Sequence, residues 1–243
     1  MVNLFNRIWG VGPATAESLY SQGYRTLEDL KSSAKVVLTK NQRIGLRLFD
    51  DLSQRMDRKE AHQIAQYVAR EASILRSGVE VIACGSFRRG KETCGDLDLL
   101  ITHPNSKALQ GFFSELIGKL EALGFLTDHL TTQHDQNQSK YLGVCQLPGG
   151  SHLHRRIDLI VVPFNEKATA LLYFTGSAHF NRSMRLHASK KGMSLSEHCL
   201  KKNVMRSSQR HKFNEGVVIP TASEESVFEA LDLPFLTPEE RDL

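Results

Sequence analysis

The chain has 243 residues, of which 40% are hydrophobic and 24% charged, and its formal net charge is +4. This composition is typical of a folded protein and excludes disordered and collagen-like classes, while the length leaves open one large domain or several smaller ones. No apolar run approaches the roughly 20 residues that a membrane-spanning helix needs, and no leader pattern follows Met1, so we expect an intracellular protein.

The predicted elements change in kind along the chain. Up to about residue 76, short apolar-periodic segments separated by glycines and polar stretches indicate helices. From residue 79, apolar and β-branched runs bounded by turn residues predict four strands of one sheet, at residues 79–84, 97–102, 141–147 and 157–162. Apolar residues at helical spacing over 106–124 predict an amphipathic helix that covers one face of this sheet. The sequence therefore indicates an α+β fold.

Beyond residue 163 the pattern is again mostly helical. We expect a helix at residues 167–174 and another after Thr221, where Glu224 stands at capping-box spacing. Between them, the segment 182–212 carries nine Lys and Arg residues and a single acid, Glu197. This local positive field suits a nucleic-acid phosphate backbone, although a solvated surface that keeps the protein soluble explains it equally well.

The segment 85–98 holds the strongest chemical signal, because a Gly-Ser turn is followed by an Asp-x-Asp pair. Side chains alternate between the two faces of a strand, so Asp96 and Asp98 should point to the same side. Two carboxylates in a small space raise each other's pKa unless a cation lies between them, and hard oxygen ligands select magnesium or manganese. A third acid, Asp158, interrupts an apolar strand and needs such a partner, because burial of an unpaired carboxylate is strongly unfavourable.

Together these residues indicate nucleotidyl transfer. Three acids on neighbouring strands can hold two ions, one lowering the pKa of an attacking hydroxyl and the other stabilising the leaving pyrophosphate. The turn at Gly85 and Ser86 offers backbone N–H groups and a hydroxyl to triphosphate oxygens, and Arg89 neutralises their charge. Taken separately, an Asp-x-Asp pair is usually a surface turn and Gly-Ser a loop, so the prediction depends on their combination with Asp158.

Two segments of the sequence resemble the family X DNA polymerases. The first is the Gly-Ser turn, spacer and Asp-x-Asp pair over 85–101, and the second is the segment 173–185, which begins with Tyr173 and Phe174. The likeness covers essentially the whole chain. It implies a template-dependent DNA polymerase, because Tyr173 and Phe174 stand where members that tolerate the absence of a template carry Gly-Trp.

The resemblance also implies an architecture of three domains. Residues 1–54 correspond to a helical fingers domain with a DNA-binding helix-hairpin-helix, and 55–162 to a nucleotidyltransferase-type palm with a mixed β-sheet. Residues 163–243 correspond to an α/β thumb that binds the nascent base pair and template. The family's upstream lyase domain matches no part of this sequence, so we expect no lyase activity from these residues and a weak preference for short gaps.

The resemblance further implies a catalytic centre. Asp96, Asp98 and Asp158 would bind two Mg²⁺ or Mn²⁺ ions, Asp158 would also receive the primer 3′-hydroxyl, and Arg156 would orient Asp158. Lys140 lies at a position near the pyrophosphate and is a candidate general acid. The nucleotide-binding positions of the family correspond to Arg55, Ser86, Arg89, Gly95, Tyr173, Phe174, Gly176, Ala178 and Asn181.

Two other parts of the chain match DNA-binding positions of the family. Arg182 and Arg185 would contact the template, with Arg185 alternating between this contact and a pairing with Glu197. Gly10 and Gly12, in a turn before a predicted helix, would let backbone amides approach a DNA phosphate. Without the resemblance, helix capping explains this turn equally well, and a Rossmann fingerprint is excluded because no strand precedes it. The resemblance also implies a Na⁺ or K⁺ ion at the carbonyls of Asn6, Ile8 and Val11.

The cellular role implied by the resemblance is gap filling in base excision repair and end joining in the nucleus. We expect the chain to act as a monomer on primer-template or gapped DNA with dNTPs, and to meet repair factors through upstream domains. Two rival functions remain open, template-independent terminal transfer and a noncatalytic DNA-end bridging subunit. The short polar loop at residues 131–140 argues against the first, because relatives without template dependence carry long loops there, and the three acids argue against the second.

Several conspicuous residues receive no functional role. His152 and His154 flank a turn without the further ligands that a zinc site needs. Trp9, the only tryptophan, is expected as a core or hairpin anchor rather than as a base-stacking platform. The four cysteines form no Cys-x-x-Cys pair, and Cys84 and Cys94 beside the active loop need no catalytic explanation.

Overall fold

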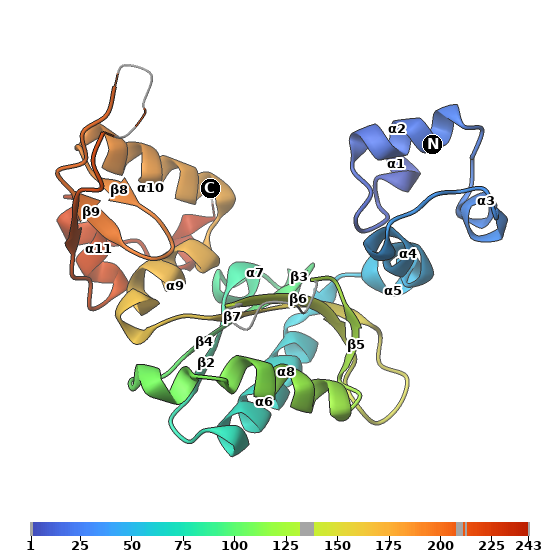
Figure 1. Ribbon diagram of the computed structural model, residues 1–243, viewed down its shortest axis with the longest axis horizontal. Coiled ribbons are helices and arrows are strands. Elements are labelled where there is room, and N and C mark those ends of the chain that lie inside the picture. The colour runs from blue at the N-terminus through green and yellow to red at the C-terminus, as the bar shows by residue number, and fades with distance from the viewer. Residues whose placement is uncertain (1, 132–138, 208–210, 212, 243) are drawn as a thin grey trace.

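The computed structural model describes residues 2–131, 139–207, 211 and 213–242. Figure 1 shows three regions in chain order: a helical N-terminal region, a central sheet backed by two long helices, and a C-terminal region that combines helices with a small sheet. The two outer regions rise from opposite ends of the central sheet, on the side away from its two long helices (Figure 1). No helix within the described ranges is both long enough and apolar enough to cross a bilayer.

The N-terminal region consists of short helices around their own apolar core. The helices are α1 (Val2–Phe5), α2 (Pro13–Ser21), α3 (Leu27–Ser32), α4 (Lys40–Arg47) and α5 (Phe49–Leu52). Thr26 and Thr39 each begin a helix with a reciprocal capping box, which satisfies backbone N–H groups that have no partner within the helix. Side chains at most 7% exposed form the core of this region, including Phe5, Ile8, Leu19, Leu30 and Leu46.

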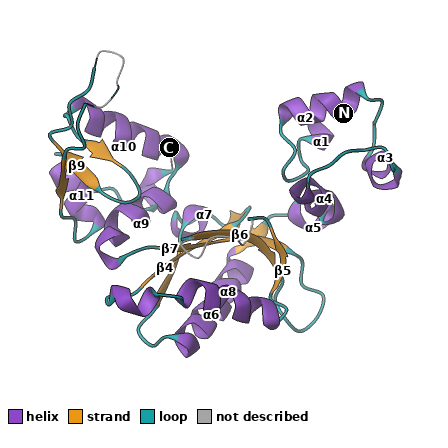
Figure 2. Cartoon of the chain, viewed as in Figure 1, coloured by secondary structure: helices purple, strands orange, loops and turns teal. Residues whose placement is uncertain are grey.

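The central sheet contains all four predicted strands and one more. Its strands are β2 (Glu80–Ala83), β4 (Leu97–Thr102), β5 (Leu126–His129), β6 (Lys140–Cys145) and β7 (Arg155–Val161). Their order is β2-β4-β7-β6-β5, and only β4 and β7 run parallel, so the sheet is mixed as expected (Figure 2). The sequence pattern missed β5 because Leu126 is followed mainly by polar residues, which weakens the apolar run typical of a strand.

Two long helices cover one face of the sheet, and the acids lie on the other. These helices are α6 (Arg58–Leu75) and α8 (Phe112–Ala122), which contact each other beneath the strands (Figure 1). Alternate residues of β4 are buried in the core against them: Leu97, Leu99 and Ile101. Asp98 and Leu100 therefore point to the opposite face, where Leu100 packs in a smaller apolar cluster with Ile160 and Ala170.

The helix predicted over 106–124 is interrupted in the structure. A short 3-10 turn, η1 (Ser106–Leu109), ends before Gly111, whose φ of +70° is a left-handed conformation that favours glycine. The α-helix proper starts only at Phe112. The expected amphipathic helix against the sheet is thus present, but its predicted beginning is wrong because the left-handed glycine breaks the helical path.

A short helical turn, α7 (Gly85–Arg88), lies between β2 and a two-residue strand β3 (Thr93–Cys94), which pairs with β1 (Met56–Asp57). Arg58 fastens this turn to the start of α6. Its Nη1 donates to the carbonyl oxygens of Phe87 at 2.7 Å and of Lys91 at 3.0 Å, and its guanidinium lies 4.2 Å from the Phe87 ring centroid. The turn is therefore a well-anchored element and not a free loop.

The C-terminal region packs helices on a small antiparallel sheet of order β10-β9-β8. Its elements are η2 (Phe164–Glu166), α9 (Lys167–Thr175), α10 (Ala178–Lys190), β8 (Ser194–Leu195), β9 (Leu200–Lys202), β10 (Val217–Ile219), α11 (Glu224–Ala230) and η3 (Glu239–Arg241). Ser177 caps α10 by accepting the backbone N–H of Phe180. The core of the region includes Leu172, Phe180, Met184, Leu200 and Phe228. The predicted helix at 167–174 corresponds closely to α9.

The predicted cap of the last α-helix is wrong. α11 does begin near the expected place, but Ser223 is its N-cap and Ser226 completes the capping box, in place of Thr221 and Glu224. Glu224 is instead 7% exposed and pairs with Arg88 of the α7 turn. Glu224 therefore forms a buried ion pair and does not cap the helix, because the C-terminal region packs against the central one.

Candidate active site

The parallel pairing of β4 with β7 brings the predicted acids together. Asp98 and Asp158 are direct neighbours in its register, and paired residues of adjacent strands share one face of a sheet. Asp96 lies one residue before β4 begins, so its predicted place on the strand is wrong. It nevertheless joins the other two acids, because Arg156 of β7 contacts both Asp96 and Asp158.

Burial and mutual repulsion shift the ionisation of these acids. Burial raises the pKa of Asp98 to about 7, and the charges of Asp96 and Asp158 add to this shift. Burial also raises the pKa of Asp158, against the opposing effect of Arg156 and Lys140. Two neighbouring carboxyl groups with raised pKa values form an arrangement that a bound cation would relieve.

Arg156 contacts Asp96 more closely than Asp158. Its Nη2 lies 2.8 Å from Asp96 Oδ2 and 4.0 Å from Asp158 Oδ1. Its guanidinium carbon is also 5.6 Å from the ring centroid of Trp9, which is half-buried beside α4 and β6 as the expected anchor. The predicted role of Arg156, orientation of Asp158, stays a prediction; in the structure this arginine contacts two acids and Trp9 of the N-terminal region.

The three acids suit a hard divalent cation chemically. Asp158 Oδ1 is buried without a hydrogen-bond partner, and an orphaned carboxylate oxygen is an acceptor that such a cation would satisfy. Within the described ranges, however, no three His, Cys, Asp or Glu side chains converge closely enough to hold an ion as they stand. We attribute this to the ion pair of Asp96 with Arg156, which turns that carboxylate toward the guanidinium.

The α7 turn packs directly against the acids. Gly85 has a φ of +57°, and a Cβ at this position would lie 2.6 Å from Asp98 Oδ2, so the turn requires glycine. Ser86 and Arg89 follow on the same turn with a spacing of three residues, which places both side chains on one side. The start of the turn is thus positioned directly beside Asp98.

Arg55 and Gly95, two further predicted triphosphate positions, are also neighbours. Arg55 is exposed and donates from Nε and Nη2 to the Thr93 hydroxyl and carbonyl, both at 2.7 Å. A Cβ on Gly95 would lie 3.7 Å from Arg55 Nη1. The pairing of β1 with β3 therefore brings this arginine to the end of the acid-bearing strand.

Arg89 is held by two residues that the sequence did not single out. Its Nε donates to Asp242 Oδ1 at 3.0 Å, and its Nη1 donates to the Thr175 carbonyl at 2.6 Å. Thr175 ends α9 and Asp242 follows η3, so both contacts come from the C-terminal region. No local pattern around Asp242 could have revealed the contact, because 153 positions separate it from Arg89.

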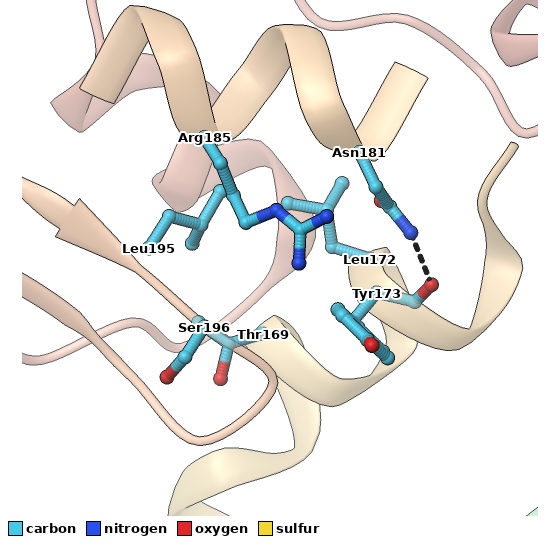
Figure 3. A pocket seen from close by; sticks show the side chains of 7 residues that line it. All are labelled: Thr169, Leu172, Tyr173, Asn181, Arg185, Leu195 and Ser196. Atoms are coloured by element: carbon cyan, nitrogen blue, oxygen red, sulfur yellow. Dashed lines mark hydrogen bonds between the residues drawn. The ribbon is translucent and has the colours of Figure 1, made fainter. Parts of the chain in front are cut away.

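The predicted nucleotide-binding residues of the C-terminal region line two adjoining hollows. The larger, of about 430 Å³, is bordered by Lys140, Tyr173, Phe174, Ala178, Asn181, Arg182 and Arg185. Figure 3 shows the smaller one, where Asn181 Nδ2 donates to the Tyr173 carbonyl at 2.7 Å and Arg185 reaches toward the Tyr173 ring. Gly176 joins this surface to the α7 turn, since a Cβ there would lie 3.3 Å from Arg89 Nη1.

The basic segment is only partly available as a positive surface. Arg185 does not pair with Glu197 in this structure, and the Glu197 carboxylate instead lies 4.0 Å from His198. Three other cations of the segment are bound within the C-terminal region: Lys191 by Asp232, Lys201 by Glu215, and Arg206 by the Met193 carbonyl. Arg210 and Lys212 lie outside the described residues.

A turn joins α1 to α2, and the two contacting helices form a hairpin whose expected DNA-binding role stays a prediction. Gly10 has a φ of +84°, and Gln42 Nε2 donates to its carbonyl at 3.1 Å. Gly12 is the N-cap of α2, and a Cβ there would meet nothing within 4 Å, so this backbone is openly accessible. The cation site in the turn stays a prediction; one of its three carbonyls, that of Ile8, already accepts the Val11 N–H at 3.0 Å.

Three family models match consecutive parts of the chain. The fingers domain of DNA polymerase lambda matches residues 3–53, the DNA polymerase beta palm residues 55–164, and the DNA polymerase beta thumb residues 170–242. The acids and the α7 turn fall in the palm match, the α1–α2 hairpin in the fingers match, and Asp242 in the thumb match.

Curated relatives match over the full length of the chain. DNA polymerase lambda of Rattus norvegicus is 54% identical over 243 residues, and that of Arabidopsis thaliana is 38% identical over 248. DNA-directed DNA/RNA polymerase mu of Homo sapiens is 31% identical over 269 residues, covering 99% of the chain. The chain spans 42%, 46% and 52% of these proteins, about half of their length. The palm match contains the mixed sheet that pairs Asp98 with Asp158, and the fingers and thumb matches cover the two outer regions. This chain therefore belongs to the family X DNA polymerases.

Proposed function

We propose that this chain is the catalytic core of a template-dependent DNA polymerase, which adds dNTPs to a primer 3′-hydroxyl. The observation that carries the proposal is the register of Asp98 with Asp158, with the glycine turn of α7 packed directly against Asp98. Carboxylates in contact with a turn suited to phosphate are what a two-ion transfer of a nucleotidyl group requires.

Asp96, Asp98 and Asp158 would hold two Mg²⁺ or Mn²⁺ ions. When bound, these ions would lower the pKa of the primer hydroxyl and stabilise the negative charge of the leaving pyrophosphate. Asp158 receives the hydrogen bond or proton of the 3′-hydroxyl, and its Oδ1, which accepts no hydrogen bond within the described chain, supports this role. Arg156 would orient Asp158, and its ion pair with Asp96 would open when the ions bind. Lys140 Nζ lies 3.9 Å from Asp158 Oδ2, near enough to the reacting groups to supply a proton to pyrophosphate.

The incoming nucleotide would lie between the α7 turn and the C-terminal region. Its triphosphate would contact Arg55, Ser86, Arg89 and Gly95. Its sugar and base would lie against the surface of Tyr173, Phe174, Gly176, Ala178 and Asn181, where the two aromatic ring centroids are 5.1 Å apart. Aromatic faces give such a surface its apolar contact area, and the backbone and amide groups give it hydrogen bonds.

DNA would contact both outer regions. We assign template contacts to the exposed Arg182 and Arg185, and a phosphate contact to the hairpin backbone at Gly10 and Gly12, with a bound Na⁺ or K⁺ beside it. The proposed setting is gap filling in base excision repair and end joining in the nucleus, with the chain acting as a monomer on primer-template or gapped DNA. No lyase activity is assigned to these residues.

The test is single-nucleotide extension of a recessed primer with Mg²⁺ or Mn²⁺. Asp158→Asn keeps the shape of the side chain and removes its charge, so templated extension should fall by at least about 10³-fold, or about 4 kcal/mol of transition-state stabilisation. The matched control Asp232→Asn makes the same change in an exposed ion pair with Lys191 and should leave the rate unchanged.

The other outcomes of this experiment separate the rival functions. Extension by the wild type without a template would favour terminal transfer. The short loop at residues 131–140 is expected to oppose terminal transfer, and its residues 132–138 lie outside the described residues. Tight DNA binding by the wild type without extension would favour a noncatalytic end-bridging subunit. Equal extension rates for the wild type and Asp158→Asn would refute the proposed catalytic role of the acids.

A further inference from the structure

A carboxylate of the C-terminal region holds the arginine of the α7 turn. We propose that Asp242 is a positioning residue, which fixes the Arg89 guanidinium in the orientation that binds the triphosphate of an incoming nucleotide. The inference rests on the proposed function, because it takes Arg89 as a triphosphate contact. Asp242 itself would not touch the nucleotide; it would act through Arg89.

Two acceptors fix the plane of the Arg89 guanidinium. Asp242 Oδ1 accepts from Nε at 3.0 Å and the Thr175 carbonyl accepts from Nη1 at 2.6 Å. A guanidinium is planar with its donors in fixed directions, so bonds at two nitrogens determine where the third points. Nη2 makes no hydrogen bond to any described residue, and the side chain is 15% exposed. The two N–H groups of Nη2 are therefore available to an anionic ligand.

The Asp242 carboxylate orients Arg89 without cancelling the positive charge of the α7 turn. Asp242 pairs with both Arg89 and Lys91, so one negative charge is shared between two positive ones. The hydrogen bonds from Lys91 and Arg89 hold the pKa of Asp242 below its usual range, which keeps it ionised. A positive charge therefore remains to attract phosphate, whereas a carboxylate paired with Arg89 alone would cancel it.

The position of Asp242 is set by the fold around it. The preceding residue, Arg241, is fully buried and donates to Glu224 Oε1 at 2.5 Å, and Arg88 of the α7 turn donates to the same oxygen at 3.0 Å. A Cβ at Gly90 would lie 3.1 Å from Glu239 Cγ, so η3 packs closely along the turn. The segment 239–242 therefore cannot move without breaking a buried ion pair, and it presents Asp242 to Arg89 as a fixed acceptor.

The test compares nucleotide binding by Asp242→Asn and wild type, on a primer-template with a dideoxy-terminated primer and Mg²⁺. Asparagine keeps the size of the side chain but loses the charge, so Arg89 is less firmly oriented. The dissociation constant for the complementary dNTP should rise about tenfold, in line with loss of one charge-assisted hydrogen bond. The maximal rate of extension from a normal primer should stay within about twofold, because the acids are unchanged. Asp232→Asn is the matched control and should bind the dNTP as the wild type does.

Two further variants separate positioning from a general effect on the fold. Asp242→Glu retains the charge and should recover most of the affinity. In an Arg89→Ala background, Asp242→Asn should add no further loss, because the residue through which it acts is gone. An unchanged or tighter dissociation constant in Asp242→Asn, or a loss that adds fully to that of Arg89→Ala, would overturn the proposal.

Because dNTP binding is measured on a primer that cannot be extended, the polymerase function and the positioning role of Asp242 can fail independently of each other. A wild type that binds the dNTP but extends no primer counts against the polymerase function and leaves the comparison of variants decisive for Asp242. A wild type that binds no nucleotide overturns the positioning role.

Discussion

Two groups of ionisable side chains lie on either side of the α7 turn, and they differ in how completely their charges are paired. On the sheet side, Asp98 and Asp158 have raised pKa values, and one buried oxygen of Asp158 has no hydrogen-bond partner. On the C-terminal side, Glu224 is buried between Arg88 and Arg241, with both of its oxygens bonded. Incomplete pairing is typical of a ligand site, and complete pairing of a structural contact.

The comparison predicts opposite responses to the same kind of substitution. Removing a charge from the acids should relieve repulsion and leave the fold intact while abolishing catalysis. Removing the charge of Glu224 should leave two arginines without their anionic partner, one of them fully buried. A buried cation without its anion is strongly unfavourable, so this change acts on stability first.

The largest effect on stability is expected from Glu224→Gln, which should lower the free energy of unfolding by about 3 kcal/mol. Urea unfolding of the wild type and the variant measures the difference. Glu229→Gln, the same change at an exposed position of the same helix, should alter the free energy by no more than about 0.5 kcal/mol. Equal losses in the two variants would contradict the structural role of the buried ion pair.

A smaller effect is expected from divalent ions, which would complete the pairing of the acids. Mg²⁺ at 10 times its dissociation constant should stabilise the wild type by about 1.4 kcal/mol per site, provided that it binds only the folded chain. Thermal unfolding with and without Mg²⁺ measures this gain. Asp98→Asn removes one of the three carboxylates and should lose most of it. An equal gain in the variant would place the ion elsewhere.

A further effect of the acids is a dependence of stability on pH in the absence of divalent ions. The folded-state pKa of Asp98 is about 7 against an ordinary value of 3.8, so the folded chain binds this proton more tightly than the unfolded chain does. The wild type should therefore lose stability relative to Asp98→Asn as pH rises from about 4 to about 7. Urea unfolding of both proteins across this range tests the sign, and a difference that does not vary with pH would contradict it.

Local patterns in the sequence predicted much of the fold and part of the site. The four apolar strands and the amphipathic helix follow from side-chain periodicity, which is a local property. The break at Gly111 and the strand from Leu126 to His129 were missed because neither leaves a strong apolar pattern. The cap at Ser223 was missed because two candidate caps stand two residues apart, and only packing of the helix selects between them.

The site shows the same division between local and long-range information. By itself, the sequence determined that Asp98 and Asp158 interrupt apolar strands and that a glycine turn precedes the first, because strand alternation and turn chemistry act between near neighbours. Only the tertiary structure decided that Arg156 binds Asp96 and that Asp242 holds Arg89. Such pairings join separate elements, and their geometry is set by how whole regions pack against one another.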